Sequence, residues 1–263
     1  MVGVHAGAAT DVGRVREVNE DAVLVGEWLF AIADGMGGQA AGEVASRLVV
    51  ESLARGDCAS LSGDSVRQLI LDASVAIGDY GRTNPDSHGL GTTVAGFAVI
   101  PGPSNLLAVF HVGDSRVYRL NERCLERLTT DHSEVTEFLE AGHVSPEEAR
   151  HHPSRHVLTR AIVEELPPQP EIRMVPAGPG DRWMIASDGL TGEVEEAEIE
   201  AILRRHASPQ ECADALVSAA LAAGGHDNVS VVVADLAFGD DYHGDLAVTA
   251  PRAVRRQNEE HQS

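Results

Sequence analysis

Short apolar runs bounded by glycine, proline or polar residues recur along the chain, and several of them alternate apolar with polar positions. Runs of this length and composition are typical of β-strands. They predict strands near Val4–Thr10, Ala22–Gly26, Trp28–Ala33, Thr92–Ile100, Leu106–Val112, Arg116–Leu120, Arg173–Pro176, Arg182–Ser187 and Val229–Leu236.

Longer segments instead repeat apolar residues at helical spacing, as Val44, Leu48 and Leu53 do. This periodicity gives an α-helix one apolar face. Pro146 and Pro209 fit the first turn of a helix, and each follows a serine that can cap it. The pattern predicts helices over Ala40–Ala54, Ser65–Tyr80, Glu134–Ala141, Pro146–His151, Glu195–His206 and Pro209–Ala223.

The order of the predicted elements favours a layered α+β fold. Strands come in hairpin-like groups and helices in pairs, without strict β-α alternation, so we expect antiparallel sheets covered by helices. The 263 residues suit one large domain or two small ones. Because the pattern ends near Phe238, we expect one domain over 1–238 and a polar, disordered tail over 239–263.

Charge and composition argue against several classes of function. The net charge is −21, and all 20 basic residues are arginine. No basic stripe is visible, which argues against nucleic-acid binding. Without a lysine, the glycine-rich segment after Asp34 is not a P-loop. Cys58, Cys124 and Cys212 lack the C-x-x-C spacing of zinc sites and disulfide frameworks. Neither a membrane span nor a signal peptide is visible, so we expect a cytoplasmic protein without a membrane partner.

Four aspartates stand at the ends of apolar runs in distant parts of the chain. Asp34, Asp114 and Asp188 follow such a run, and Asp227 precedes one. A carboxylate presented at a strand end suits hard metal ions. A single Asp-Gly pair would be a turn, but four such positions predict a site assembled by the fold. An acidic protein that acts on an anionic substrate must also neutralise its own field, which divalent cations would do.

The residues around these aspartates indicate the chemistry of the site. Glycines after Asp34 let the chain expose a backbone carbonyl as a further ligand, and oxygen ligands select Mg²⁺ or Mn²⁺ over zinc. Two such ions would share a carboxylate and acidify a water for attack on phosphorus. Upstream, Arg16 could bind phosphate oxygens in a bidentate manner, and Glu20 and Asp21 add carboxylates.

These residues belong to motifs that occur in a known order. The motifs are R-x-x-N-E-D (Arg16 to Asp21), A-D-G-M-G-G (Ala33 to Gly38), G-T-T (Gly91 to Thr93), V-G-D-S-R (Val112 to Arg116), L-T-x-D-H-S (Leu128 to Ser133), H-P-x-x-x-x-L-T-R (His152 to Arg160), S-D-G-L (Ser187 to Leu190) and D-N (Asp227, Asn228). Over about residues 3 to 238, the chain resembles the metal-dependent PPM or PP2C-type serine/threonine phosphatases in their compact bacterial form.

The resemblance implies a four-layer α-β-β-α sandwich with two central, mostly antiparallel sheets and a metal cleft at one end. Asp34 would be a catalytic residue that bridges two Mg²⁺ or Mn²⁺ ions. Gly35 would lend its backbone carbonyl to the second ion. Asp188 and Asp227 would complete the shell of the first ion.

Further roles follow from the same resemblance. Glu20 and Asp21 would act near the second metal ion, through waters. Asp114, together with Asp188, would hold a third and weaker ion. Arg16 would be the catalytic and substrate-binding arginine that holds the phosphate.

Two positions depart from the family pattern. Met36 stands where many relatives have a histidine that is thought to protonate the leaving group, and a thioether cannot donate a proton. We expect a metal-bound water to serve instead. Val163 stands where relatives usually have glycine, at the end of a segment, about 130–163, that resembles the family's flap at the border of the cleft.

Two further groups receive structural interpretations. His143, His151, His152 and His156 crowd the flap, and without an obvious carboxylate partner we interpret them as solvated surface residues. The Asp131–Ser133 segment has the composition of a hydrolase triad. However, adjacent residues seldom face one another, and the G-x-S-x-G elbow is missing.

The resemblance thus implies a protein serine/threonine phosphatase that hydrolyses phosphoserine and phosphothreonine by direct attack of a metal-activated water. Phosphoproteins, targets of a bacterial serine/threonine kinase, are the expected partners of a monomeric enzyme. Two alternatives stay open at this point. One is a regulatory module that binds a partner through the metal cleft, and the other is a small-molecule phosphomonoesterase.

Overall fold

The computed structural model describes residues 2–37, 41–85, 89–102, 104–150, 152–164 and 166–238, whose strands form two antiparallel sheets. The five-stranded sheet has the order β1 (Val2–Asp11), β12 (Val229–Phe238), β11 (Arg182–Ala186), β7 (Arg116–Leu120) and β8 (Leu125–Arg127). The seven-stranded sheet has the order β10 (Glu171–Pro176), β6 (Leu106–Val112), β5 (Val94–Ile100), β3 (Leu29–Met36), β4 (Gly91–Thr92) and β9 (Ile162–Val163), and β2 (Asp21–Val25) also pairs with β3.

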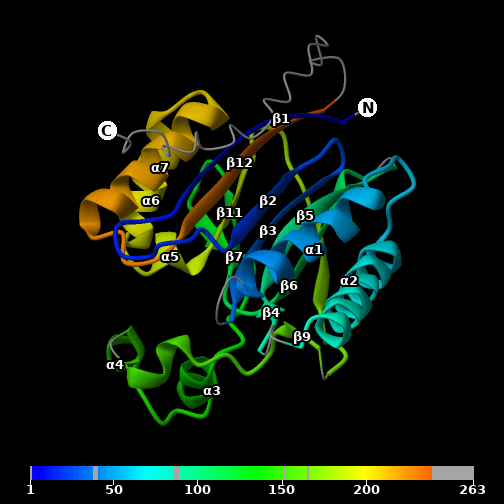
Figure 1. Ribbon diagram of the computed structural model, residues 1–263. Coiled ribbons are helices and arrows are strands. Elements are labelled where there is room, and N and C mark those ends of the chain that lie inside the picture. The colour runs from blue at the N-terminus through cyan, green and yellow to red at the C-terminus, as the bar shows by residue number, and fades with distance from the viewer. Residues whose placement is uncertain are drawn as a thin grey trace, which may run out of the picture.

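Helices cover the outer face of each sheet (Figure 1). The seven-stranded sheet carries α1 (Ala41–Arg55) and α2 (Gly63–Thr83), and the five-stranded sheet carries α5 (Asp188–Thr191), α6 (Glu196–Arg205) and α7 (Pro209–Ala223). At one end lie α3 (Glu134–Glu140), α4 (Pro146–Arg150) and the 3₁₀ turn η1 (Pro153–His156). The predicted α-β-β-α sandwich is confirmed.

Three apolar layers hold the sandwich together, and strand β3 shows why. Its Leu29 and Ala31 pack toward α1 and α2, whereas Phe30 and Ile32 pack between the two sheets. Alternating residues of a strand point to opposite faces, so a strand buried on both faces must be apolar throughout. This explains the unbroken run from Leu29 to Ala33.

Most predicted elements are confirmed with ends shifted by a few residues, and the exceptions concern short or extended pieces. Strand β3 continues to Met36, so Asp34 lies within the strand and not after it, because β4 pairs with its last residues. The strand predicted over Thr92–Ile100 is interrupted at Thr93. The short elements β8, β9, α5 and η1 were not predicted.

The two predicted serine caps differ. Ser145 caps α4, because its hydroxyl accepts the N–H of Glu148 while that glutamate accepts the N–H of Ser145. The cap predicted before α7 is wrong, since the Ser208 side chain makes no cap hydrogen bond. Among the helices that the structure describes, none is long and apolar enough to cross a membrane. The predicted tail over 239–263 lies outside the described residues.

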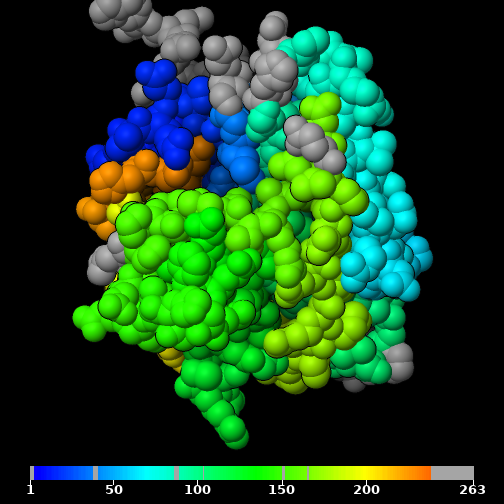
Figure 2. Space-filling model, turned by 90° about the horizontal axis from the view of Figure 1, so that it is seen from below, coloured from blue at the N-terminus to red at the C-terminus, as the bar shows by residue number. Residues whose placement is uncertain are grey.

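The segment predicted to form a flap folds over one end of the sandwich. Its neck is narrow: residues Ser133 and Leu158 form an isolated β-bridge, and the N–H of Glu134 donates to the carbonyl of Val157. Viewed toward this end, the green segment covers much of the face and lies beside the blue N-terminal and orange C-terminal parts of the chain (Figure 2).

Candidate metal centre

Aspartates from four separate parts of the chain converge at this end of the sandwich. Asp21 and Asp34 lie directly opposite each other in the β2–β3 pair, so their side chains share one face. Asp188 opens α5 directly after β11, and Asp227 lies just ahead of β12, the strand that pairs with β11. The centre therefore draws on both sheets.

Hydrogen bonds tie these strand ends to one another. Ser187 Oγ donates to Asp21 Oδ2 at 3.0 Å. Asn228 holds the β1–β2 loop at three points: its Oδ1 accepts the N–H of Glu20 at 2.8 Å, and its Nδ2 donates to the carbonyls of Val12 and Val18. Asn228 thus fixes the loop that carries Arg16. The sequence reasoning included Asn228 in a motif but gave it no role.

Glycine is required at position 35 because other backbones approach it closely. A Cβ placed there would lie 2.2 Å from the carbonyl oxygen of Gly42 and 2.6 Å from that of Glu20. The N–H of Gly35 donates to the Glu20 carbonyl at 3.1 Å. The carboxylate of Glu20 in turn accepts the N–H of Gly42, in the first turn of α1. Glu20 is therefore held beside the Asp34–Gly35 strand end.

Thr93 joins Asp34 to the loop of Asp114. The backbone of Thr93 donates to the Asp34 carbonyl at 2.8 Å, its hydroxyl accepts the N–H of Asp34 at 3.2 Å, and the same hydroxyl lies 2.9 Å from Ser115 Oγ. Because the N–H of Asp34 donates to the Thr93 hydroxyl and not to the backbone carbonyl of Thr93, the strand predicted over this region is interrupted at Thr93. Asp114 is buried and precedes Ser115 directly.

The crowding of carboxylates shapes the electrostatics of the centre. Burial, with a smaller contribution from Asp188, raises the pKa of Asp21 and of Asp114 to about 7. Burial and repulsion from Asp21, Asp188, Asp114 and Asp227 raise the pKa of Asp34 well above its usual range. Buried like charges disfavour ionisation of each other, and a bound cation reverses that effect.

The donor set fits divalent cations. Asp21 Oδ1 is buried and has no hydrogen-bond partner among the described residues. A buried acceptor left unpaired is costly, and in a cluster of oxygens a hard cation would pair it. Every ligand candidate is an oxygen atom, which favours Mg²⁺ or Mn²⁺ over zinc.

Arg16 lies beside the carboxylates. Its Nη2 donates to Asp227 Oδ2 at 2.7 Å, and about half of its side chain is exposed. Glu20 and Asp188 also attract its charge. Arg16 therefore stands at the open side of the centre, where a guanidinium can meet an incoming anion.

A histidine of the flap also lies near the centre, although no carboxylate partner for it was obvious from the sequence. His156 Nδ1 lies 3.6 Å from Asp188 Oδ2, and this carboxylate raises the pKa of His156. The side chain of His156 is 58% exposed, so its interpretation as a solvated surface residue is confirmed, but it does have a carboxylate neighbour in Asp188. His143 is exposed, and His151 lies outside the described residues. Only the three-dimensional path of the flap places His156 there.

A cleft of about 580 Å³ opens from the centre between the flap and the α5–α6 segment. Asp114 and Asp188 line its inner end, and Arg155 and His156 line the flap side. The centre is thus accessible to a substrate larger than inorganic phosphate.

Two other sequence features have clear positions. Met36 lies at the end of β3, opposite Gly91, and Val163 pairs with Gly91 from the other side. The Asp131–Ser133 segment forms no triad: Asp131 pairs with Arg116, and Ser133 Oγ contacts Thr136 Oγ1.

The sequence model of protein phosphatase 2C matches residues 13–223. The chain belongs to the protein phosphatase 2C family. It is similar to the serine/threonine protein phosphatase PstP of Mycobacterium tuberculosis, with 41% identity over 87% of this chain and 44% of that relative. It is also similar to the serine/threonine phosphatase stp of Listeria monocytogenes, with 36% identity over 88% of this chain and 96% of the relative. The chain therefore spans less than half the length of the mycobacterial relative.

Solved structures of this protein phosphatase 2C family share the fold. The crystal structure of Mycobacterium tuberculosis PstP gives a TM-score of 0.84 at 39% identity, over 89% of this chain and 99% of that one. The catalytic domain of PstP in complex with two manganese ions gives a TM-score of 0.81 at 36% identity, over 90% of this chain and 100% of that one.

Proposed function

We propose that this chain is a Mg²⁺- or Mn²⁺-dependent protein serine/threonine phosphatase. The observation that carries the proposal is the convergence of Asp21, Asp34, Asp114, Asp188 and Asp227 on one centre, from which Asp114 and Asp188 line an open cleft, with Asp21 Oδ1 buried and unpaired among the described residues. Named relatives with this activity, and a relative holding two manganese ions, support it.

The proposed ligand set follows the positions in the fold. Asp34 would be shared between two cations, Gly35 would contribute its backbone carbonyl, and Asp188 and Asp227 would complete one shell. Glu20 and Asp21 would act near the second cation by holding its waters in place, and Asp114 with Asp188 would hold a third cation. When bound, the cations lower the pKa of a water to near neutrality and polarise the phosphate ester.

The protein's own groups would orient the substrate. Arg16 can exchange its contact with Asp227 for the phosphate oxygens, since its side chain is half exposed. The cleft beside the flap would accept the residues that flank the phosphorylated side chain. The imidazole of His156, 3.6 Å from Asp188, can hydrogen-bond an oxygen of the substrate, whereas Met36 cannot.

The decisive measurement is Mn²⁺-dependent turnover of a phosphothreonine peptide by wild type, Asp34→Asn and Asp188→Asn. Asp72→Asn is the matched control, because Asp72 is exposed on α2 and only accepts a bond from Gln68 among the described contacts. We expect wild type and Asp72→Asn to turn over the peptide and the other two variants to fail. Failure of wild type with both Mg²⁺ and Mn²⁺ would refute the proposal and favour a regulatory module.

A panel of phosphorylated metabolites separates the proposal from a small-molecule phosphomonoesterase. A protein phosphatase prefers the phosphopeptide, because a cleft of this size contacts several flanking residues. We further propose that the enzyme acts as a monomer in the cytoplasm, on proteins phosphorylated by a serine/threonine kinase. Light scattering of the purified chain tests the first point, and fractionation of the source cells tests the second.

A further inference from the structure

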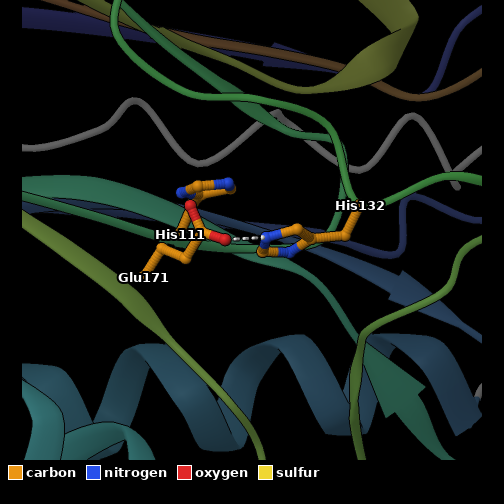
Figure 3. A group of neighbouring side chains, drawn as sticks. All are labelled: His111, His132 and Glu171. Atoms are coloured by element: carbon orange, nitrogen blue, oxygen red, sulfur yellow. Dashed lines mark hydrogen bonds and ion pairs between the residues drawn. The ribbon is translucent and has the colours of Figure 1, made fainter. Parts of the chain in front are cut away.

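Behind the flap neck, His111 of β6, His132 and Glu171 of β10 form a compact cluster (Figure 3). One ligand atom from each residue lies within 4.8 Å of the other two. The imidazole rings of His111 and His132 stack with their centroids 4.4 Å apart. Two imidazoles and a carboxylate are a common set for transition metals, so the hydrogen bonds must decide whether the cluster holds one.

The hydrogen bonds of His132 oppose metal binding. Its Nδ1 accepts the backbone N–H of Gly113 at 3.1 Å, so a neutral imidazole carries its proton on Nε2. That proton points to Glu171 Oε1, 3.2 Å away. A metal on Nε2 would require an imidazolate or the loss of the Gly113 bond, whereas metal-bound histidines normally donate their second N–H.

The surrounding groups oppose a metal as well. Arg160 Nη1 donates to Glu171 Oε1 at 2.9 Å, which places a guanidinium where a cation would need that oxygen. His111 Nε2 lies 2.8 Å from the Thr130 carbonyl and therefore donates. Burial lowers the pKa of both histidines, so they stay neutral. The cluster is therefore a hydrogen-bonded network in which the donor and acceptor role of each bonded histidine nitrogen is set by its partner.

This network ends at the loop that carries Asp114. His132 and Gly113 exchange two hydrogen bonds, since the N–H of His132 also donates to the Gly113 carbonyl at 3.0 Å. The carbonyl of His132 accepts the N–H of Thr159 at 2.9 Å, on the returning side of the flap. One residue thus connects both sides of the flap neck to the peptide just before Asp114.

The backbone of Gly113 is closely confined by its surroundings. Its φ is +108°, and a Cβ there would lie 2.6 Å from Thr93 Cγ2. The loop is therefore packed against Thr93 on one side and held by the His132 imidazole on the other. Loss of the hydrogen bond to His132 Nδ1 should therefore displace the Asp114 carboxylate more than any other candidate ligand.

We propose that His132 is a positioning residue: its Nδ1 holds the Gly113–Asp114 peptide in the orientation that the weak, third divalent cation requires. Glu171 contributes by accepting the Nε2 proton of His132, and Arg160, whose Nη1 lies 3.2 Å from Nε2, holds that carboxylate in place by donating to its Oε1. His132 itself contacts neither substrate nor cation. This inference rests on the proposed function, because it assumes that Asp114 and Asp188 hold that cation.

Two substitutions separate the two nitrogens of His132. Asparagine places an oxygen near Nδ1, so His132→Asn can still accept the Gly113 N–H but cannot reach Glu171. Glutamine places a nitrogen near Nε2, so His132→Gln keeps the Glu171 contact and loses the Gly113 bond. His111→Gln is the matched control in the same cluster, since it keeps a donor to Thr130 and does not contact Gly113.

Equilibrium binding of Mn²⁺, followed by the electron paramagnetic resonance signal of the free ion, measures each class of site without turnover. In His132→Gln we expect the weakest Mn²⁺ site to lose about tenfold in affinity, the size typical of lost outer-shell partners. The tighter sites should be unchanged. His132→Asn and His111→Gln should match wild type, and the Mn²⁺ concentration for half-maximal turnover should follow the same order. Should His132→Gln not fold, His132→Ala removes the same acceptor and carries the same expectation.

Several outcomes would overturn the inference. Equal weakening in His132→Asn and His132→Gln would show that Nδ1 is not the group that matters. An unchanged weak site in both, or no weak site in wild type, would do the same. Tight Zn²⁺ binding by wild type that Glu171→Gln abolishes would show a metal site instead. A wild type that binds Mn²⁺ but turns over no phosphopeptide refutes the proposed function separately.

Discussion

Asp131 and the aspartates of the metal centre lie near each other at the end of the sandwich, but their side chains have opposite kinds of neighbour. Asp131 is paired with two arginines: Arg116 donates to Oδ1 through Nε and to Oδ2 through Nη2, and Arg127 also donates to Oδ1. Asp34 and Asp21 have mainly other carboxylates around them. The charge of Asp131 is balanced by arginines of the chain itself, whereas the charge of the clustered aspartates would be balanced by cations from solution. Crowded carboxylates without arginine partners thus mark a binding site, and paired ones mark a structural contact.

The largest expected difference between substitutions of Asp34 and of Asp131 is in enzymatic activity. Asp34→Asn should reduce Mn²⁺-dependent turnover of a phosphothreonine peptide by about 10³-fold or more, because it removes the carboxylate that the cations would share. Asp131→Asn, measured at a temperature where it is fully folded, should keep most of the activity. Similar losses in the two variants would mean that the two groups do not differ in the way described.

Stability should show the reverse order. Asp131→Asn leaves Arg116 and Arg127 largely buried with one carboxylate charge fewer, which should lower the free energy of unfolding by about 2 kcal/mol and Tm by roughly 5 °C. Asp34→Asn should stabilise the metal-free protein, because it relieves repulsion. Thermal unfolding in the presence of a chelator measures both, and a destabilised Asp34→Asn would contradict the account.

A pH series sharpens the same contrast. The pKa of Asp114 is raised to about 7, above its value in the unfolded chain, so the metal-free folded state holds a proton that the unfolded state has released. This carboxyl therefore stabilises the fold at low pH and loses that contribution as pH rises from about 4 to about 7. Asp114→Asn should match wild type near pH 4 and exceed its Tm by at least about 5 °C at pH 8 in a chelator. Saturating Mn²⁺ should abolish the advantage.

The smallest expected effect concerns the proton donor. Met36→His should speed hydrolysis of a phosphoserine peptide by roughly a few-fold, well below the about 10²-fold lower range for general acid catalysis, and should speed an activated aryl phosphate less. The reason is that a seryl alkoxide needs a proton and a good leaving group does not. Equal acceleration of both substrates would show that the histidine acts in another way.

The sequence predicted the layers and the carboxylates, because both depend on local patterns. Continuous apolar runs such as Leu29–Ala33 predict strands buried on both faces, and Asp188 and Asp227 stand beside such runs. The end of β3 was misplaced because its last pairs form with β4, a two-residue strand of which only Thr92 belonged to a predicted strand. Residue types near a strand end do not disclose which distant segment will pair with it.

The flap was the least predictable region. His156 reaches Asp188 because η1 folds back across the cleft, and no periodicity in the sequence encodes that path. The partners of Asn228 and His132 lie far away in the sequence, on loops whose course depends on the packing of both sheets. Long-range polar contacts of this kind follow from tertiary structure and cannot be read from spacing.

The register of the β2–β3 hairpin has a consequence for how the chain reaches its native state. Asp21 lies opposite Asp34, and a slip by one residue would turn the two carboxylates to opposite faces. A divalent cation bound by Asp34, with a water that Asp21 holds, would stabilise the native pairing and none of its slipped alternatives. The ions proposed for catalysis would then also favour the correct register during folding, because hairpins in a slipped register could not bind them.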